Sequence, residues 1–241
     1  MPQQTIPRMK TIGVIGGLGP QSTLDILDRL HKVCQKRIPQ MANSGYPRLY
    51  VGFCHEAPMA INADGSMRDP LAPSSELLDV ARAIGAITDF LIIASNTPHL
   101  FASEIEEVSG RVVLSIVDAV VEEIRKRGSK NVGIIAVGEA LRQGMYQRAL
   151  DAQGIKWVAI PLDVSKALDM SIFAIMEGDD PAALSRPAED AVAYLRAQKV
   201  DGIILGCTEI PLLLGSACDE RDIINPSQLL AEVAVRYAIE P

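Results

Sequence analysis

Residues 201–211 are DGIILGCTEIP, an apolar run followed by a glycine, polar residues and a proline. A short apolar run bounded by turn-forming residues is typical of a buried strand in a parallel sheet. An earlier stretch, DFLIIASNTPH (89–99), aligns with it without gaps at a distance of 112 residues. We therefore expect two equivalent units, each a buried strand that leads directly into a helix.

A second pair of matching stretches supports an internal repeat. TIGVI (11–15) aligns with NVGII (131–135), which lies 120 residues further on, and both pairs occur in the same order along the chain. One short match between strand–helix sequences carries little weight, but two in the same order indicate a duplicated unit. The sequence therefore predicts two similar halves.

Strands and helices are expected to alternate along both halves. The expected strands cover 11–15, 48–53, 89–94, 131–137, a segment around Trp157, and 201–206. The expected helices follow caps at Ser22 or Thr23 and at Ser74 or Ser75, and then cover 118–127 with Gly128 as its end, 139–153, 167–176, 182–198 and a C-terminal stretch capped by Ser227. This alternation favours mostly parallel sheets with helices on both faces.

The predicted fold class is α/β, with two similar lobes that are related by a pseudo-twofold axis. Each lobe is a mostly parallel sheet flanked by helices, and the active site lies in the cleft between the lobes. We expect residues 1–115 together with 220–241 to form the first lobe, which carries Ser95. Residues 116–219 form the second lobe, which carries Cys207.

The composition excludes several classes of protein. The chain has 241 residues, 48% of them hydrophobic, and a net charge of −7, which argues against a dedicated nucleic-acid binder. No segment is apolar enough to predict a membrane span, and the N-terminus does not resemble a secretory signal. The four cysteines lack the spacing of a zinc site. We therefore expect a cytoplasmic protein with reduced thiols and no bound metal.

Ser95 and Cys207 occupy the same place in the two aligned stretches, directly after a buried strand. Ligands of open α/β sheets bind outside the carboxyl ends of the strands, and the free N–H groups of a helix start favour a carboxylate. A helix start also lowers the pKa of a cysteine, so Cys207 is expected to ionise easily. Two lobes that face each other would set these residues on opposite sides of one cleft.

Three motifs stand out along the chain: Gly16-Gly17-Leu18-Gly19-Pro20 followed by Ser22-Thr23, Ala-Ser-Asn-Thr-Pro-His at 94–99, and Gly-Cys-Thr-Glu-Ile at 206–210. Together they resemble the motifs of the aspartate/glutamate racemase family of cofactor-independent enzymes. They occur in the family's order and span almost the whole chain. The resemblance implies an isomerase that moves the α-proton of an amino acid between two opposed acid/base residues, without pyridoxal phosphate, any other cofactor or metal.

The same resemblance implies roles for individual residues. Ser95 and Cys207 would be the catalytic pair, and Glu209 would orient or tune the thiol. The substrate, a small amino acid or dicarboxylate, would be held by Gly17, Leu18, Asn96, Thr97, Pro98, Lys166 and Thr208. The family also implies a homodimer and gives no reason to expect a nucleic-acid or membrane partner.

The chain departs from the family pattern in three places. Ser95 stands where most members have a cysteine, and a hydroxyl is a weak base, so turnover is expected to favour one direction. The loop 54–65 contains no arginine, although aspartate-specific relatives use one there to bind the side-chain carboxylate. AVGEA (136–140) replaces a threonine-containing segment. The last two differences leave the substrate open.

Other interpretations remain open at this point. A single thiol in the cleft is also compatible with a decarboxylase of substituted malonates or an isomerase of the same fold, or with a carboxylate-binding protein that has lost activity. Ser95 could be a helix N-cap and Cys207 a buried structural residue. The glycines at 16, 17 and 19 lack the spacing of a dinucleotide-binding loop.

Overall fold

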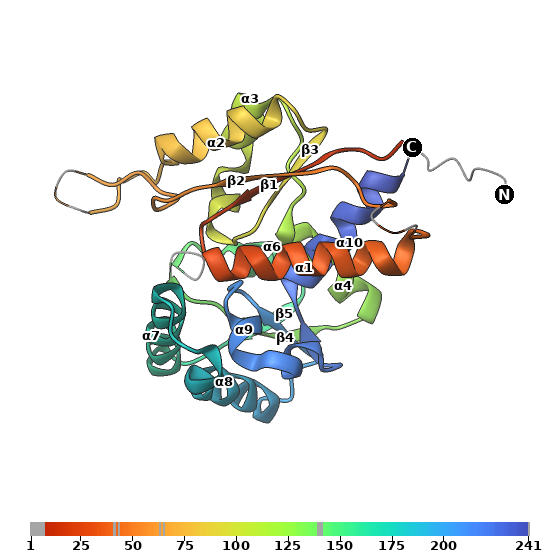
Figure 1. Ribbon diagram of the computed structural model, residues 1–241. Helices are drawn as coiled ribbons and strands as arrows, with labels where there is room; N and C mark the ends of the chain where they lie inside the picture. The colour runs from red at the N-terminus through yellow and green to blue at the C-terminus, as the bar shows by residue number, and fades with distance from the viewer. Residues whose placement is uncertain are drawn as a thin grey trace.

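The computed structural model describes residues 8–40, 42, 44–62, 64, 66–138 and 142–240, within which the strands form two parallel sheets (Figure 1). The strand order of the first sheet is β2 (Leu49–Phe53), β1 (Ile12–Gly16), β3 (Phe90–Ile93). That of the second is β5 (Lys156–Ala159), β4 (Asn131–Ile135), β6 (Gly202–Leu205), β7 (Ile223–Ile224). Neighbouring strands are parallel in both sheets, and the expected α/β fold with two lobes is confirmed.

The strand registers reproduce the internal repeat. β1 pairs with β3 so that Ile12 lies opposite Phe90, and β4 pairs with β6 so that Val132 lies opposite Gly202. The offsets of 120 and 112 residues found in the sequence relate the first pair to the second. β2 and β5 hold matching places on the other side of the central strand. The residues that follow β3 and β6 are therefore structurally equivalent.

Helices surround both sheets. They are α1 (Pro20–Arg37), α2 (Ser75–Gly85), α3 (Ala102–Ser109), α4 (Ile116–Arg127), α6 (Met145–Asp151), α7 (Leu162–Glu177), α8 (Arg186–Ala197), α9 (Ile210–Leu214) and α10 (Pro226–Ile239), with short 3-10 helices η1 (Thr97–Phe101), η2 (Pro181–Leu184) and η3 (Gly215–Asp219). Within the described ranges, no helix is long and apolar enough to span a membrane.

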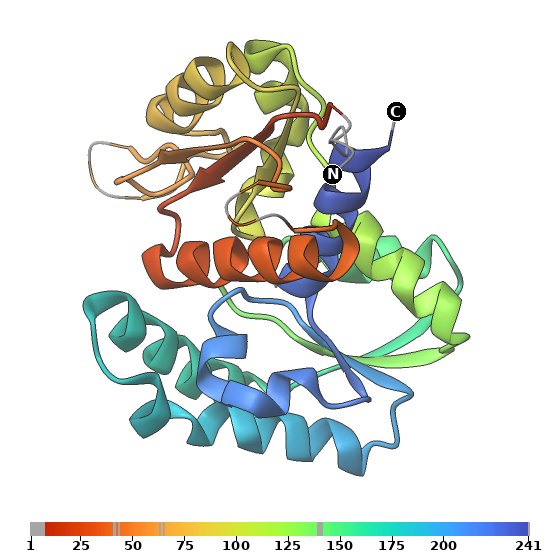
Figure 2. The ribbon, with the colours of Figure 1, turned by 45° about the vertical axis from the view of Figure 1, so that its right-hand side comes forward.

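Each sheet is covered on both faces, which accounts for the nearly continuous apolar runs of its strands. α1 and α10 pack on one face of the first sheet, and α2 and α3 on the other. α4 and α6 cover one face of the second sheet, and α7, α8 and α9 the other. α1 lies between the two sheets in both views (Figures 1 and 2) and packs along α10. These two helices therefore join the halves.

Two of the expected helix ends are confirmed. Ser74 caps α2, because its hydroxyl accepts a hydrogen bond from the backbone N–H of Leu77 at 3.2 Å. α4 ends at Gly128 in the left-handed conformation, with φ 69°, which glycine adopts without steric cost. In both helices the end could be recognised from the sequence, as a serine N-cap for α2 and a glycine after the last turn for α4.

The expected cap of α1 was wrong. The helix begins at Pro20 with Gly19 as N-cap, and Ser22 and Thr23 lie inside its first turn. Their hydroxyls donate back to the carbonyl oxygen of Gly19, at 3.0 and 2.8 Å, instead of accepting from the helix N–H groups. Proline can occupy the first helical position because its missing N–H has no partner there.

The cap of α10 also differs from the expectation. Asn225 caps this helix, since its side-chain oxygen accepts from the backbone N–H groups of Ser227 and Gln228. Ser227, the expected cap, lies buried inside the first turn. Of the helix expected over 139–153, residues 139–141 lie outside the described part of the chain, and α6 begins at Met145.

The last two elements of the chain, β7 and α10, pack against different sheets. β7 pairs with β6 in the second sheet, although residues 220–241 were expected to belong to the first lobe. α10, which follows directly, packs against α1 and α4 and contributes to the core of the first sheet. The division into 1–115 with 220–241 and 116–219 stays a prediction.

Candidate active site

The thiol of Cys207 lies directly beyond the carboxyl end of β6 and donates a hydrogen bond to Oε2 of Glu209 at 3.0 Å. The hydroxyl of Thr208 donates to the same oxygen at 3.1 Å. Thr208 and Glu209 are both buried, and Cys207 is partly exposed. The second carboxylate oxygen, Oε1, has no hydrogen-bond partner within the described ranges. The carboxylate therefore has one oxygen occupied by the thiol and one free for another group.

The pKa of Cys207 is raised well above its usual value, which corrects the expectation of an easily ionised thiol. Burial disfavours the thiolate most, and the negative charge of Glu209 and its hydrogen bond from the thiol act in the same direction. The charge of Asp169 on α7 adds to the effect. α9, the helix that follows, has only five residues and cannot offset burial beside a carboxylate. Cys207 is thus a protonated thiol whose proton has an acceptor, the carboxylate of Glu209, within hydrogen-bond distance.

The glycine-rich turn after β1 meets Glu209 from the other half. A Cβ atom at Gly19 would overlap Oε1 of Glu209 and would lie 2.6 Å from the hydroxyl of Ser22. Gly19 is therefore required by close approach, because any side chain there would displace the carboxylate. Gly17 has φ 81° and packs against the backbone of Cys54, as a tight turn demands.

Ser95 lies beyond the carboxyl end of β3 and is partly buried. Its hydroxyl makes no hydrogen bond within the part of the chain that the structure describes. The helical segment η1 starts one residue later, with Asn96 in the cap position, so the structure does not show Ser95 as an N-cap. The hydroxyl is available to a ligand.

The backbone of Ser95 is held by His99. The ring Nδ1 of His99 lies 2.9 Å from the carbonyl oxygen of Ser95. Burial lowers the pKa of His99 to about 4, so the ring is neutral near pH 7. A carbonyl can only accept, and Nδ1 must therefore carry the ring proton. His99 positions the Ser95 backbone and does not supply a charge.

A hydrogen bond between the halves joins Asn96 to Tyr146. The hydroxyl of Tyr146 lies 2.5 Å from Oδ1 of Asn96, and both residues are almost fully buried. Burial raises the pKa of Tyr146, and the nearby charge of Cys207 adds to this. Nδ2 of Asn96 has no partner in the described part of the chain. This contact and the Gly19–Glu209 contact bring the strand ends of the two sheets together.

The other predicted site residues fall into two groups. Leu18 lies in the turn before α1, Thr97 and Pro98 begin η1, and Thr208 contacts Glu209, so these residues flank the contacts described above. Lys166 lies on α7 with an exposed side chain, and the structure does not connect it to Ser95 or Cys207. None of these positions tests a role in substrate binding.

Two residues near the thiol have no signal in the sequence. Tyr146 lies on α6, and Asp169 lies on α7, where burial raises the pKa of its carboxyl group. The negative charge of Asp169 raises the pKa of Cys207, and the charge of Cys207 in turn raises the pKa of Tyr146, so both residues lie near the thiol although they come from other elements. Neither follows a strand or belongs to a recognisable motif, so only the tertiary structure could place them.

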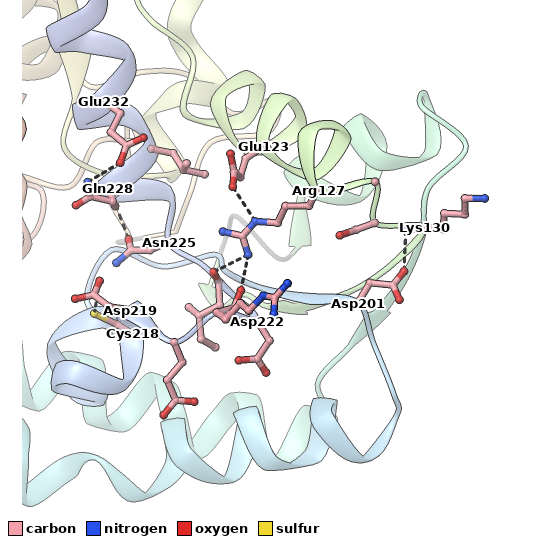
Figure 3. Close-up of a pocket in the computed structure, with 16 residues that line it drawn as sticks. Glu123, Arg127, Lys130, Asp201, Cys218, Asp219, Asp222, Asn225, Gln228 and Glu232 are labelled. Carbon is pink, nitrogen blue, oxygen red and sulfur yellow. Dashed lines mark hydrogen bonds and ion pairs between the residues drawn. The ribbon is translucent and has the colours of Figure 1, made fainter. Parts of the chain in front are cut away.

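A surface depression of about 970 Å³ is not part of this site (Figure 3). It lies at the amino ends of β4 and β6, beside Lys130 and Asp201, whereas Cys207 follows the carboxyl end of β6. Its walls carry both acidic and basic side chains, several of them already joined in hydrogen bonds and ion pairs (Figure 3). Ligand sites of open α/β sheets lie at the opposite end of the strands.

Comparisons with known proteins agree with this arrangement. A family model described as Asp/Glu/Hydantoin racemase matches residues 15–234. The broad specificity amino-acid racemase RacX of Bacillus subtilis (strain 168) is 25% identical over 227 residues, which cover 93% of this chain and 96% of that protein.

Two solved structures share the fold over nearly their whole length. The aspartate racemase of Picrophilus torridus has a TM-score of 0.76 at 21% identity, with 95% of this chain and 94% of that one covered. An aspartate racemase homologue from Pyrococcus horikoshii OT3 has a TM-score of 0.74 at 24% identity, with 96% and 100% covered. At this level of identity the likeness concerns the fold.

Proposed function

The chain belongs to the Asp/Glu/hydantoin racemase family, and from this premise we propose that it is an amino-acid racemase of the aspartate/glutamate type that works without a cofactor. Its acid/base residues would be Cys207 and Ser95. The observation that carries the proposal is the hydrogen bond from the Cys207 thiol to Glu209, at the place where the second half meets Gly19 of the first.

The state of the thiol supports a proton transfer through Glu209. Because the pKa of Cys207 is raised, a free thiolate is scarce near pH 7. Sγ can still remove the α-proton of a substrate if its own proton passes to Oε2 of Glu209 in the same step. One C–H bond breaks, one S–H bond forms, and the carboxylate becomes a carboxylic acid. The reverse transfer restores both groups.

The surrounding polar groups suit an amino acid with a free α-carboxylate. Nδ2 of Asn96 is a buried donor without a partner among the described residues, and Thr97 and Thr208 lie at the same ends of the strands. The N–H groups of a segment that starts a helix favour an anion as well. We propose that these groups hold the carboxylate while the α-carbon lies between Sγ of Cys207 and Oγ of Ser95.

The side chain of the substrate also needs a binding partner in the site. The loop after β2 lacks an arginine between residues 54 and 65, so a second carboxylate has no obvious partner there. The similarity to a racemase named for broad specificity supports a site that accepts more than aspartate and glutamate. We therefore propose that aspartate and glutamate are members of a wider set of substrates.

Ser95 gives the proposed reaction an internal asymmetry. A hydroxyl can donate a proton to a carbanion, but it must be deprotonated before it can remove one. The equilibrium constant of a racemisation is one, so kcat/KM is the same for both enantiomers and the bias cannot appear there. It appears instead as faster exchange of the α-proton through the Cys207 face than inversion through the Ser95 face.

Exchange of the α-proton in D2O tests the proposal directly. The purified protein is incubated with single enantiomers of a panel of amino acids, and loss of the α-proton signal and inversion are followed together. Exchange with at least one amino acid supports the function. No exchange with any of them, even after Ser95→Cys restores the second thiol, would exclude it.

A second candidate follows from the single thiol. An enzyme with Cys207 alone could protonate the carbanion left when a substituted malonate loses CO2, and Ser95 would then have no acid/base role. Release of CO2 from a malonate without an amino group, dependent on Cys207, would favour this reaction over racemisation. A carboxylate-binding protein without turnover is the third outcome, and it predicts binding that Cys207→Ser leaves unchanged. The homodimer and the cytoplasmic location stay predictions.

A further inference from the structure

We propose that Tyr146 is a positioning residue that fixes the side-chain amide of Asn96 with its N–H donors toward the substrate carboxylate; this rests on the function proposed above. Asn96 follows Ser95 directly, whereas Tyr146 comes from α6 in the other half of the molecule. The hydroxyl of Tyr146 and Oδ1 of Asn96 are 2.5 Å apart and buried.

The direction of this hydrogen bond follows from which of the two atoms can donate a proton and which can only accept one. Oδ1 of Asn96 can only accept, so the Tyr146 hydroxyl donates to it. If the amide were turned over, Nδ2 would donate to the tyrosine oxygen, and both Oδ1 and the hydroxyl proton would lack a partner among the described residues. The observed arrangement leaves only the Nδ2 group of this pair without a partner there. It is the orientation with fewer buried polar groups unsatisfied.

The packing of Tyr146 makes it a rigid anchor. Its ring lies in the core between α4, α6 and the second sheet, with Val120, Ile124 and Leu150 in the same cluster. A side chain held in this way loses little further entropy when its hydroxyl is fixed in place. The hydroxyl is therefore a fixed donor to which the amide of Asn96 must adapt.

The unpaired donor has a use in the proposed reaction. A buried N–H without an acceptor costs free energy, and it recovers that cost when a ligand supplies one. Asn96 lies one residue from Ser95, and Tyr146 is close enough to Cys207 for the thiolate charge to raise its pKa. The α-carboxylate of a substrate between these two residues would supply the acceptor. Tyr146 thus acts through Asn96 and never touches the reacting atoms.

The test is a double-mutant cycle with Tyr146→Phe and Asn96→Ala. Tyr146→Phe keeps the ring in the core and removes only the hydroxyl, so the amide is free to turn its oxygen toward the substrate. We expect kcat/KM for the best substrate to fall about tenfold or more, mainly through KM. In the Asn96→Ala background the same change should have almost no effect. Tyr46→Phe is the matched control, because the hydroxyl of Tyr46 bonds to Gln35 at the surface.

A second measurement needs no substrate, so it separates this inference from the proposed function. The side-chain N–H resonances of Asn96 are followed by NMR in the free protein and in Tyr146→Phe. The two amide protons of any asparagine give separate signals because rotation about the C–N bond is slow, so the readout is their chemical shifts, which should move toward those of an unstructured asparagine, or broaden, when the hydroxyl is removed. If the wild-type protein exchanges no α-proton, the racemase proposal fails and these signals still decide the role of Tyr146.

Two results would overturn the inference. One is a loss of activity in Tyr146→Phe that persists unchanged in the Asn96→Ala background, which would mean that the hydroxyl stabilises the fold and not the amide. The other is an Asn96 amide whose signals are the same with and without the hydroxyl. Thermal unfolding of all four proteins shows whether each variant is folded when it is measured.

Discussion

Cys207 and Glu209 form a thiol–carboxylate pair in which the thiol donates to Oε2 across 3.0 Å. The pair comes from one turn of chain after β6, and Glu209 is buried where it meets Gly19 of the other half. A cysteine beside a carboxylate is a poor nucleophile in its resting state, since the negative charge opposes the thiolate. It becomes an acid/base when the carboxylate can take its proton.

Glu209→Gln should make Cys207 more reactive toward iodoacetamide. The substitution removes the negative charge but leaves the burial, so the pKa of the thiol falls without reaching that of a free cysteine. We expect the alkylation rate at pH 8 to rise about three- to tenfold, since the rate follows the thiolate fraction. Alkylation of a Cys207→Ser protein gives the background from the other three cysteines, which are buried. An unchanged or slower rate would show that the carboxylate does not control the thiol.

The same substitution should abolish catalysis while it activates the thiol. Loss of the proton acceptor removes the route by which Sγ exchanges its proton, so α-proton exchange should fall by about two to four orders of magnitude. A disturbed fold would also expose the thiol and stop turnover, so the opposite changes support the proposed role only when the thermal unfolding of Glu209→Gln matches that of the wild type. Parallel changes would contradict the proposed role of Glu209.

Gly19→Ala should displace the carboxylate of Glu209, because Gly19 approaches it from the first half of the molecule. The new Cβ would overlap Oε1 of Glu209, so the carboxylate must move away from its position beside the thiol. Crowding of this kind costs about 1–3 kcal/mol of stability, and we expect activity to fall much further than stability. Urea unfolding and exchange rates are measured on the same samples. Gly19→Ala added to Glu209→Gln should cost little more activity than Glu209→Gln alone, and full additivity would argue against the contact.

Ser95→Cys should change the ratio of inversion to exchange. A thiol at this position can both remove and donate the α-proton, which makes the two faces of the site more alike. We expect inversion to accelerate relative to α-proton exchange by about ten- to a hundredfold. Ser103→Cys is the matched control, because Ser103 is exposed on α3. The ratio is read from one NMR time course with a chiral assay, and no change in it would mean that Ser95 takes no part in the proton transfer.

His99 should make the stability of the protein depend on pH in the acid range. Burial lowers the pKa of His99 to about 4 in the folded state. Between about pH 6.5 and 4 the ring is therefore protonated in the unfolded state but neutral in the folded state. The free energy of unfolding is therefore unaffected by His99 above pH 6.5, and it decreases by roughly 1 kcal/mol per pH unit as the pH falls toward 4. In His99→Gln the fall of the unfolding free energy over this range should be shallower. His31→Gln, at an exposed site on α1, should follow the wild type.

Much of the fold could be predicted from the sequence because its signals are local. The apolar runs at β3 and β6 are bounded by turn residues, and runs this short favour a buried strand over a helix. Gly128 and Ser74 mark helix ends through their own backbone and side-chain chemistry. The alignment of the two halves even carries the strand register, since Ile12 opposite Phe90 corresponds to Val132 opposite Gly202.

The parts that could not be predicted depend on tertiary contacts. The sequence indicates a helix after Cys207, but not that it is only five residues long or that burial outweighs its dipole, so the direction of the pKa change was wrong. Tyr146 lies 50 residues from Asn96, and no periodicity relates them. Ser22 was expected to cap α1 from its residue type, yet the helix begins at Pro20 with Gly19 as N-cap, and Gly19 also leaves room for the carboxylate of Glu209.

The most direct test of the central claim is α-proton exchange by Cys207→Ala in D2O, measured beside the wild-type protein with the amino acid that exchanges fastest. Cys207→Ala removes the thiol and keeps Glu209, so we expect exchange to fall by at least about a hundredfold while thermal unfolding stays near that of the wild type. Exchange at the wild-type rate in this variant would show that the proton chemistry does not pass through Cys207.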